Sequence, residues 1–341
     1  MLLVALGAAA ALVSRPALAA DFTAWPTDDW TVVKPEAEGV SSASLDALRD
    51  YLRDCGSKAG LVARHGRIVG EWYWSEATAS TPYLVYSTTK SVSSTAAGLA
   101  IARGKFGLDS KVGEFLPDVT PVEKRDITVR QILSMTTGVK NNSDLMKEKD
   151  LFTYALQRAP MAFKPGEHWE YNNTGLSLLT PLFVKATGEE IDAFLDHELF
   201  APIGIKKSDW TWDHEEGHAL PFTGLHITAR ALARIGLVFL NDGRWQSRQV
   251  VPAAWVAEAT RASQDLNKDY GYLWWNNASG KKWKGAPTDA YAALGRNDNN
   301  MYILPTQEMI VIRQVGDDTE KHKVDQAKIV SLAVAAVADK P

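Results

Sequence analysis

A serine and a lysine three residues apart are the residues of this sequence with the clearest chemical potential, in the stretch Ser87-Thr-Thr-Lys90. A serine hydroxyl is a weak nucleophile and needs an adjacent base before it can attack a carbonyl carbon. Residues three apart share one face of a helix, so the Lys90 amine can reach the Ser87 oxygen. Unpaired N–H groups in the first turn of that helix would favour developing negative charge. The pair therefore predicts a nucleophile with its general base.

The same spacing also occurs by chance, and Ser279 and Lys282 repeat it in a stretch rich in Asn, Gly and Lys. The alternative interpretation of Ser87 is a helix-capping serine followed by a surface lysine. The small residues of 87–103 favour the catalytic interpretation, because they predict a buried helix that would keep Lys90 out of water. Desolvation there would lower the pKa of Lys90 toward the range that a base needs.

A tyrosine and two asparagines follow a Lys-Pro-Gly turn, in the order Tyr171-Asn172-Asn173. A tyrosine can relay a proton, and a nearby lysine would stabilise its phenolate. The Asn173 amide has the groups to hold both Lys90 and a substrate carbonyl. An ordinary loop tyrosine and a turn asparagine are the alternative, and it stays open at this point.

A possible metal motif is His214-Glu-Glu-Gly-His218, which fits the His-Glu-x-x-His pattern of zinc peptidases. That chemistry requires a helix with both imidazoles on one face. Gly217 inside the stretch and Pro221 just after it both oppose such a helix. We therefore expect a polar loop over a domain junction here, and no metal site.

The elements that must position these residues are predicted from hydrophobic spacing and turn residues. Helices are expected over 42–52, 87–103, 129–134, 150–158, 176–187, 191–199, 228–241 and 323–338. Strands are expected over 60–64 and 67–74, around a His65-Gly66 turn, and over 301–304 and 309–314, around Pro305. Strands at both ends of the chain with helices between them indicate an α+β fold. We expect a discontinuous sheet domain, 21–104 and 225–341, with a helical domain, 105–224, inserted into it.

The N-terminal stretch has the features of a secretory signal peptide. Residues 2–13 are apolar, and Ala17-Leu18-Ala19 follows as a small-residue cleavage site, which predicts a signal peptide over residues 1–20. An apolar first helix of the domain is the alternative. The run is too short to cross a membrane and no cysteine suggests a lipid anchor, so we expect no membrane anchor. Export of a chain with one cysteine indicates a bacterial periplasm or secretion.

Composition excludes several classes of protein. The chain has 341 residues, 45% of them hydrophobic and 23% charged, which is typical of a globular protein with an ordinary core. A net charge of -4 argues against a nucleic-acid partner. The single cysteine, Cys55, excludes an internal disulfide and four-thiolate zinc or iron–sulfur sites. We expect a small-molecule substrate and no cofactor.

Taken together, the motifs resemble the serine β-lactamase and penicillin-binding-protein superfamily, in particular its class C-like branch of family VIII esterases, D-aminopeptidases and 6-aminohexanoate-dimer hydrolases. Beyond the two motifs above, the resemblance rests on the segments 127–138, 163–166, 224–236 and 270–275. It implies a β-lactamase-like antiparallel sheet flanked by helices, with an inserted and mostly helical domain and the site between the two. It also implies that Ser87 is the acylated nucleophile, Lys90 its base and Tyr171 the partner in proton transfer.

The remaining site residues follow from the resemblance with one departure. The third motif of the family is Lys-Thr-Gly or His-x-Gly, and here Gly295 matches its glycine while Ala293 stands at the cationic position. The backbone N–H groups of Ser87 and Arg296 are candidates for an oxyanion hole, worth roughly 3 kcal/mol per donor. The Arg296 side chain is a candidate for the missing charge, and a solvated turn over 296–300 is the alternative.

Three further residues are candidates for substrate binding. Asn173 takes the place of the asparagine in the tyrosine motif, Trp275 would line an acyl or aromatic pocket, and His226 would lie in the cleft. A buried core pair with Trp274 is the alternative for Trp275, and a structural role is the alternative for His226.

The departure in the third motif directs the functional expectation. The cation at that position normally helps to bind a substrate carboxylate, so its absence disfavours penicillin turnover and D-Ala-D-Ala cleavage. We expect an exported serine hydrolase that acts on carboxylic esters or linear amides. A β-lactamase or D-Ala-D-Ala carboxypeptidase and a non-catalytic acyl-binding module are the alternatives.

Overall fold

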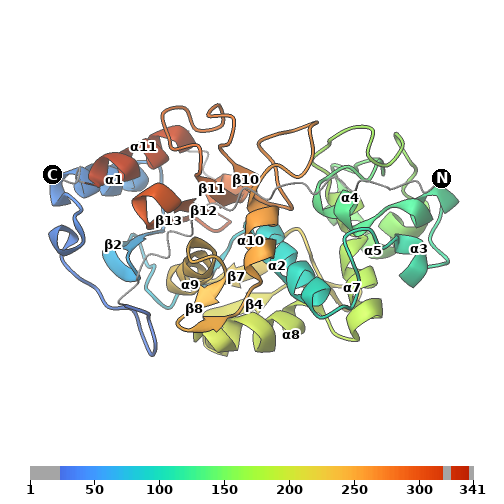
Figure 1. The fold of residues 1–341 in the computed structure, drawn as a ribbon, viewed down its shortest axis with the longest axis horizontal. Coiled ribbons are helices and arrows are strands. Elements are labelled where there is room, and N and C mark those ends of the chain that lie inside the picture. Colours follow the sequence, from blue (N-terminus) through green and yellow to red (C-terminus); the bar gives the residue numbers. More distant parts are fainter. Residues whose placement is uncertain (1–23, 318–323, 338–341) are drawn as a thin grey trace, which may run out of the picture.

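A computed structural model describes residues 24–317 and 324–337 of the chain. The predicted signal peptide over residues 1–20 lies outside the described residues. The chain folds into a sheet covered by helices on one side of the molecule and a group of helices on the other (Figure 1). This architecture confirms the predicted α+β fold.

A six-stranded antiparallel sheet joins segments from both ends of the chain. In spatial order its strands are β10 (Trp275–Asn276), β11 (Tyr291–Leu294), β12 (Asn300–Leu304), β13 (Met309–Gln314), β1 (Ala59–Arg64) and β2 (Arg67–Tyr73). Strand β1 pairs antiparallel with β13, with Ala59 opposite Gln314. The predicted hairpins 60–74 and 301–314 are therefore neighbours in this sheet, and β2 forms one of its edges.

Helices cover both faces of this sheet, which explains why its central strands read as continuous apolar runs. On one face, α1 (Ser42–Asp54) and α11 (Gln326–Ala336) pack together (Figure 1). On the other face, α9 (Ala229–Leu240) packs on β1, β12 and β13. Along β13, Met309 and Val311 pack into the core on the side of α1 and α11, while Ile310 and Ile312 pack into the core on the side of α9. This alternation follows from the period of two along a strand.

The segment between β2 and α9 carries most of the remaining helices. They are α2 (Thr88–Ala102), α3 (Val112–Phe115), α4 (Val129–Leu133), α5 (Leu151–Thr153), α6 (Asn173–Leu176), α7 (Leu179–Thr187) and α8 (Ile191–Leu195), and α10 (Ala253–Thr260) follows α9. Helices α3, α4, α5 and α7 gather on the side away from the large sheet, and α2 lies between them and the sheet (Figure 1). Every residue of α2 from Thr88 to Ala100 is buried, as its small side chains predict.

Three small sheets complete the fold. One has the order β3 (Tyr83–Leu84), β7 (Leu225–Ile227) and β4 (Trp210–Trp212). The other two are hairpins, β5 (His214–Glu215) with β6 (His218–Ala219), and β8 (Arg244–Trp245) with β9 (Arg248–Gln249). None of the helices within 24–317 and 324–337 is both long and apolar enough to cross a membrane.

The His-Glu-x-x-His stretch forms the β5–β6 hairpin, and the helix that zinc chemistry requires does not form. His214 Nε2 lies 3.2 Å from a carboxylate oxygen of Asp192, and His218 Nδ1 lies 2.8 Å from one of Glu190. Each imidazole therefore has its own carboxylate partner at the start of α8. In the part of the chain that the structure describes, no group of three or more His, Cys, Asp or Glu side chains is placed to hold a metal ion.

Candidate active site

Ser87 lies at the start of α2, directly after a tight reversal of the chain. Tyr86 has a φ of 47°, in the left-handed region that residues other than glycine rarely adopt. Backbone strain of this kind persists where the surrounding structure fixes it, and it concentrates at functional sites. It places Ser87 at the N-cap of a helix whose whole first turn is buried.

The Lys90 side chain is buried from solvent, and its amine reaches the Ser87 hydroxyl. The side chain is 1% exposed, and Nζ donates hydrogen bonds to Ser87 Oγ at 2.8 Å and to the carbonyl oxygen of Phe222 at 3.0 Å. Burial disfavours the ammonium and holds the pKa of Lys90 well below its ordinary value. The neutral amine that a general base requires is therefore favoured in the folded protein.

Tyr171 completes the cluster that the sequence predicts. Lys90 Nζ lies 4.8 Å from the centre of the Tyr171 ring, and the phenol shares a hydrogen bond with Ser87. Burial outweighs that hydrogen bond and raises the pKa of Tyr171 to about 12. The structure thus brings the hydroxyl, the amine and the phenol together. The phenol therefore keeps its proton at neutral pH, whereas burial shifts the amine toward its neutral form.

Asn173 is the first residue of α6, two positions after Tyr171. Its Oδ1 is buried and has no hydrogen-bond partner, while Lys90 donates to Ser87 and Phe222 instead. The expected link between this amide and Lys90 is therefore absent from the described contacts. A buried amide without a partner near the tyrosine can receive a group from a ligand.

The stretch that matches the third motif lies against the nucleophile turn. A Cβ on Gly295 would come within 2.2 Å of the Val85 carbonyl oxygen, so only glycine permits the observed contact. Within 24–317 and 324–337, the backbone N–H groups of Ser87 and Arg296 donate no hydrogen bond. Both candidate oxyanion donors are therefore available to a ligand. Ala293, at the position where the family has a cation, is fully buried.

The Arg296 side chain points to the nucleophile turn from the exposed side. Its guanidinium carbon lies 5.7 Å from the centre of the Tyr86 ring. The turn that follows is held from inside by Asn299, whose carbonyl oxygen accepts a hydrogen bond of 2.6 Å from Thr88 Oγ1. This contact ties the turn after β11 directly to the first residue of α2.

An aromatic wall borders the cluster, formed by Trp169, Tyr171, Tyr270 and Trp275. Trp275 stacks on Tyr171 with ring centres 6.0 Å apart and meets Tyr270 edge-on at 4.8 Å. Trp274 points the other way, is fully buried and lies 4.4 Å from the Phe239 ring. The two neighbouring tryptophans therefore have different environments: Trp274 belongs to the core, and Trp275 belongs to the wall beside Tyr171.

Residues 270–275, which carry Tyr270 and Trp275 and form the wall segment, are held by α2 from one side. The hydroxyls of Ser91 and Ser94 donate to the carbonyl oxygens of Leu273 (2.7 Å) and Tyr272 (2.6 Å). These two serines face the wall segment from the same helix that carries Ser87 and Lys90. One helix thus positions both the nucleophile pair and the backbone of the wall.

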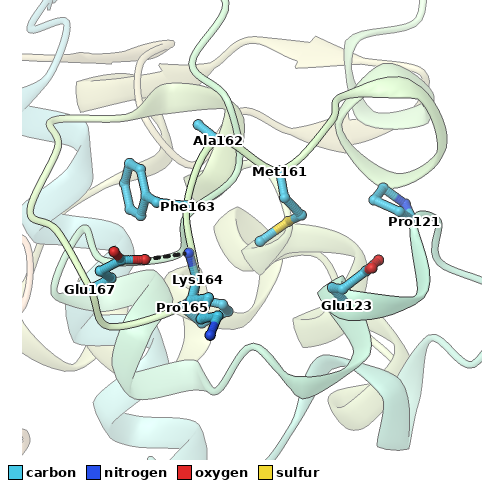
Figure 2. A pocket seen from close by; sticks show the side chains of 8 residues that line it. All are labelled: Pro121, Glu123, Met161, Ala162, Phe163, Lys164, Pro165 and Glu167. Carbon is cyan, nitrogen blue, oxygen red and sulfur yellow. Dashed lines mark hydrogen bonds between the residues drawn. The ribbon is translucent and has the colours of Figure 1, made fainter.

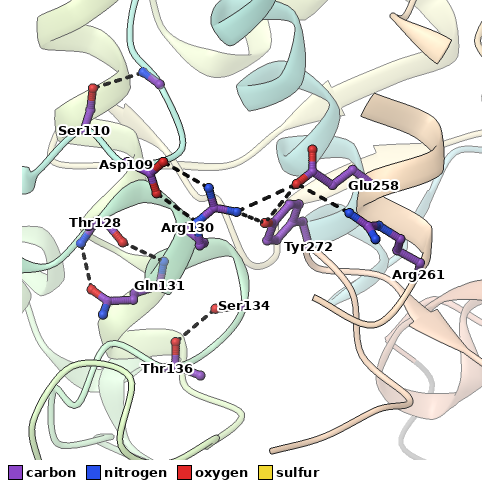
Figure 3. Close-up of polar contacts among 11 residues, drawn as sticks. Asp109, Ser110, Thr128, Arg130, Gln131, Ser134, Thr136, Glu258, Arg261 and Tyr272 are labelled. Carbon is purple, nitrogen blue, oxygen red and sulfur yellow. Dashed lines mark hydrogen bonds and ion pairs between the residues drawn. The ribbon is translucent and has the colours of Figure 1, made fainter. Parts of the chain in front are cut away.

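A polar network fixes the same segment from the helical side (Figure 3). Arg130, in α4, donates to the Tyr272 hydroxyl at 2.7 Å and holds Asp109 with two further hydrogen bonds. Tyr272 in turn donates to a Glu258 oxygen at 3.4 Å. The helical part of the molecule and the wall segment are therefore joined through one guanidinium.

His226 lies on β7, one strand away from the segment that leads to Ser87. It pairs with Leu84 in the backbone register, and its Nε2 lies 3.3 Å from a carboxylate oxygen of Asp213. Its only described side-chain partner is thus Asp213, and no described hydrogen bond connects it with Ser87, Lys90 or Tyr171.

A surface pocket of about 560 Å³ lies elsewhere, beside the segment 161–167 (Figure 2). Its lining residues are Pro121, Glu123, Met161, Ala162, Phe163, Lys164, Pro165 and Glu167. None of them is a predicted site residue. The chemistry of the Ser87 cluster, not the size of this pocket, therefore identifies the candidate site.

Three contributors to the site were not predicted from the sequence. Phe222 and Asn299 both contribute a backbone carbonyl oxygen, to Lys90 and to Thr88 respectively. Any residue type could supply such a group, so the sequence gives no sign of either contact. Tyr270 belongs to the segment 270–275 that carries the family resemblance, and this was a usable indication. Outside these three, Lys282 Nζ lies 3.8 Å from the centre of the Trp275 ring, in the stretch whose sequence showed only that it is rich in Asn, Gly and Lys.

Comparison with known proteins finds a family model and similar sequences that cover most of the chain. A family model described as Beta-lactamase matches residues 49–338. A 6-aminohexanoate-dimer hydrolase of Paenarthrobacter ureafaciens is 20% identical over 293 residues, which cover 79% of this chain and 75% of the relative. Esterase EstB of Burkholderia gladioli is 25% identical over 225 residues, which cover 55% of this chain and 57% of the relative.

A solved structure gives the same fold. A putative 6-aminohexanoate-dimer hydrolase from Bacillus anthracis superposes with a TM-score of 0.71 at 17% identity, over 92% of this chain and 87% of that chain. The helices and the antiparallel sheet described above therefore have the same arrangement in a solved protein.

Proposed function

The chain belongs to the beta-lactamase family of serine hydrolases, and from this premise we propose that it hydrolyses carboxylic esters or linear amides through an acyl-enzyme on Ser87. The observation that carries the proposal is the 2.8 Å contact between Ser87 Oγ and the fully buried amine of Lys90, next to Tyr171. A nucleophile and a base in hydrogen-bond contact, with a third group beside them, is the arrangement that acyl transfer needs.

Acylation begins with the neutral amine of Lys90, which accepts the Ser87 hydroxyl proton as Oγ bonds to the substrate carbonyl carbon. The carbonyl oxygen becomes negative and is stabilised by the backbone N–H groups of Ser87 and Arg296. When the tetrahedral intermediate collapses, the bond to the leaving group breaks. Tyr171 gives its proton to the leaving oxygen or nitrogen and recovers one from Lys90. The acyl group then remains on Ser87, and Lys90 is neutral again.

Deacylation repeats the same steps with water. Neutral Lys90, alone or through Tyr171, takes a proton from the water that attacks the acyl carbon. The acid is released when the bond to Ser87 Oγ breaks, and the serine recovers the proton. Because the pKa of Tyr171 is raised to about 12 and that of Lys90 is lowered, we assign the base to the lysine and the proton relay to the tyrosine.

Esters and linear amides are favoured over β-lactams by the residue that replaces the cation of the third motif. Ala293 is apolar and buried where the family has the cation that helps to bind a substrate carboxylate. The names of the relatives do not discriminate, because they include an esterase, a hydrolase of an aminohexanoate dimer and a Beta-lactamase.

Export to a bacterial periplasm or to the medium is part of the proposal. The support is the sequence of residues 1–20, with its apolar run and small-residue cleavage site. N-terminal sequencing of the protein recovered from the outer compartment of a producing bacterium tests it, with a new terminus at about residue 20 or 21 as the expected result. An intact residue 1 on all of the protein would contradict it.

Steady-state hydrolysis by purified protein tests the activity. The panel is p-nitrophenyl acetate, hexananilide and nitrocefin, with Ser87→Ala as the inactive variant. Ser93→Ala is the matched control, because Ser93 lies on the same helix and its buried hydroxyl has no partner. We expect Ser87→Ala to lower kcat by about a thousandfold or more and Ser93→Ala to leave it unchanged.

Three outcomes would contradict the proposal. Turnover that survives Ser87→Ala excludes Ser87 as the nucleophile. Nitrocefin turnover faster than that of the ester and the amide supports a β-lactamase. A single stoichiometric acylation without turnover supports an acyl-binding module.

A further inference from the structure

A half-buried lysine stands at the outer end of the aromatic wall. Lys282 lies in the loop 277–290 between β10 and β11, and its Nζ is 3.8 Å from the centre of the Trp275 ring. The described partners of this ammonium are the Trp275 ring and, at 5.8 Å, the Trp283 ring, and no described hydrogen-bond acceptor or ion-pair carboxylate contacts it. A partly desolvated charge without a hydrogen-bond acceptor is unfavourable. An anionic ligand that accepts a hydrogen bond from this ammonium would therefore be stabilised here.

The charges around Lys282 favour such an anion on balance, although the Asp269 carboxylate opposes it. Asp269 attracts the ammonium without a direct contact, and burial lowers the pKa of Lys282 despite it. The loop also carries Lys281 and Lys284, which are both exposed. Three lysines within four residues give this edge of the wall a positive potential, which draws anionic ligands to it.

A chain of contacts connects Lys282 with the proposed nucleophile. The Trp275 ring under Lys282 stacks on Tyr171, and the Tyr171 ring lies 4.8 Å from Lys90 Nζ. A second donor without an acceptor lies beside the same indole, because Trp169 Nε1 is buried and unpaired and its ring centre is 6.1 Å from that of Trp275. Two unpaired donors therefore flank an apolar surface that begins at the reacting groups.

We propose that Lys282 and Trp275 form a subsite for a carboxylate at the far end of the substrate, with the apolar chain of that substrate packed along the indole. The substrate class is an ester or amide of a dicarboxylic acid, or another acyl compound with a remote carboxylate. This inference rests on the proposed function, since it places the scissile bond at Ser87. It departs from the third motif of the family, because the cation comes from the loop before β11 and not from Ala293.

Binding to an inactive variant tests the subsite independently of turnover. In Ser87→Ala protein, titration calorimetry compares the monoanilides of succinic, glutaric, adipic and suberic acids with hexananilide, which lacks the second carboxylate. We expect at least one monoanilide to bind about tenfold or more tightly than hexananilide. Adding Lys282→Met should remove that preference and leave the affinity for hexananilide unchanged.

Two control variants distinguish a specific subsite from general charge. Lys281→Met removes an exposed charge from the same loop and should leave the preference intact. Lys282→Arg keeps a cation at the site and should retain most of the preference. Equal affinity for charged and uncharged anilides in Ser87→Ala protein would overturn the proposal. So would a Lys282→Met variant that loses affinity for both, because the lysine would then only support the wall.

Turnover separates this inference from the proposed function. In the active enzyme, Lys282→Met should raise KM for mono-p-nitrophenyl dicarboxylates about tenfold and leave kcat and all constants for p-nitrophenyl hexanoate unchanged. Absence of turnover by wild type with every ester contradicts the proposed function, while the calorimetric comparison still decides the subsite. Turnover without a carboxylate preference contradicts only the subsite.

Discussion

A lysine serves as a base near neutral pH only if its surroundings hold it uncharged, and Lys90 has such surroundings. It is 1% exposed, no described carboxylate pairs with it, and its two hydrogen-bond partners are the neutral oxygens of Ser87 and Phe222. The protein therefore destabilises the ammonium at the position where the proposed mechanism needs a neutral amine.

The pH profile of kcat/KM should report this lysine. Because the base must be neutral, kcat/KM should rise with pH through the lowered pKa of Lys90, with a midpoint well below the ordinary value of 10.5. Tyr171 has a pKa of about 12, so its loss of a proton should cause no descending limb at neutral or mildly alkaline pH. Initial rates with an amide substrate measure this profile. A midpoint at the ordinary lysine value would contradict the assignment.

Gly295 provides a second residue-scale prediction. A Cβ at this position would lie 2.2 Å from a backbone oxygen of the turn that carries Ser87, so Gly295→Ala must push the two segments apart. Displaced oxyanion donors should lower kcat by about 100-fold. Gly107→Ala is the matched control, because its Cβ would meet nothing closer than 3.9 Å. Equal kinetics of the two variants would show that the contact is unimportant.

At the scale of elements, a buried lysine away from the active site ties one helical segment together. Lys124 is fully buried, and its Nζ donates to the carbonyl oxygens of Thr120 (2.6 Å), Ala155 (2.7 Å) and Leu156 (3.3 Å). These bonds join the turn before α4 to the end of the segment that begins with α5. The amine here satisfies backbone acceptors, so its role is structural.

Lys124→Met should therefore reduce stability without altering the chemistry. Three carbonyl oxygens, one buried and two partly buried, would lose a donor, and we expect the free energy of unfolding to fall by about 2 to 3 kcal/mol. Urea unfolding measures the change, and kcat per folded molecule should stay the same. Lys149→Met, at an exposed lysine, should have little effect on either quantity. A loss of kcat with unchanged stability would contradict this role.

The helices and strands that could be predicted from the sequence are those with a clear run of apolar or small residues. The strands 60–64 and 309–314 are dense in Leu, Val and Ile, and the helix after Ser87 is dense in small residues. Strand β11 was missed because Ala292 and Ala293 have low strand propensity, and its pairing with β12 creates it. Strands β3, β4 and β7 have two or three residues each, which is too short for a periodic pattern.

At the scale of the whole molecule, the site depends on how the helical part meets the sheet. Arg130 bridges the two through Tyr272, and α2 holds the same segment through two serines (Figure 3). Arg130→Met should lower the free energy of unfolding by about 1 kcal/mol, because the guanidinium is half-exposed. Asp109→Asn, at a carboxylate 80% exposed, should cost less than about 0.5 kcal/mol. Thermal unfolding that does not separate the two variants would contradict a specific bridge.

The proposed catalytic residues could be predicted because sequence motifs carry them, whereas the aromatic wall beside them could be predicted only in part. Ser87, Lys90 and Tyr171 were identified from spacing and resemblance, and the structure brings them together. Lys282 is far from all three in the sequence and meets Trp275 only through the loop before β11. Contacts of this kind depend on tertiary packing, and no local pattern encodes them.

The most direct test of the whole account is covalent labelling of the nucleophile. A fluorophosphonate probe, followed by proteolysis and mass spectrometry, should place one adduct on Ser87 in the wild type. Labelling should slow strongly in Lys90→Met and should disappear in Ser87→Ala, while Ser93→Ala labels normally. An adduct on any other residue, or labelling of equal rate without the lysine amine, would contradict the account.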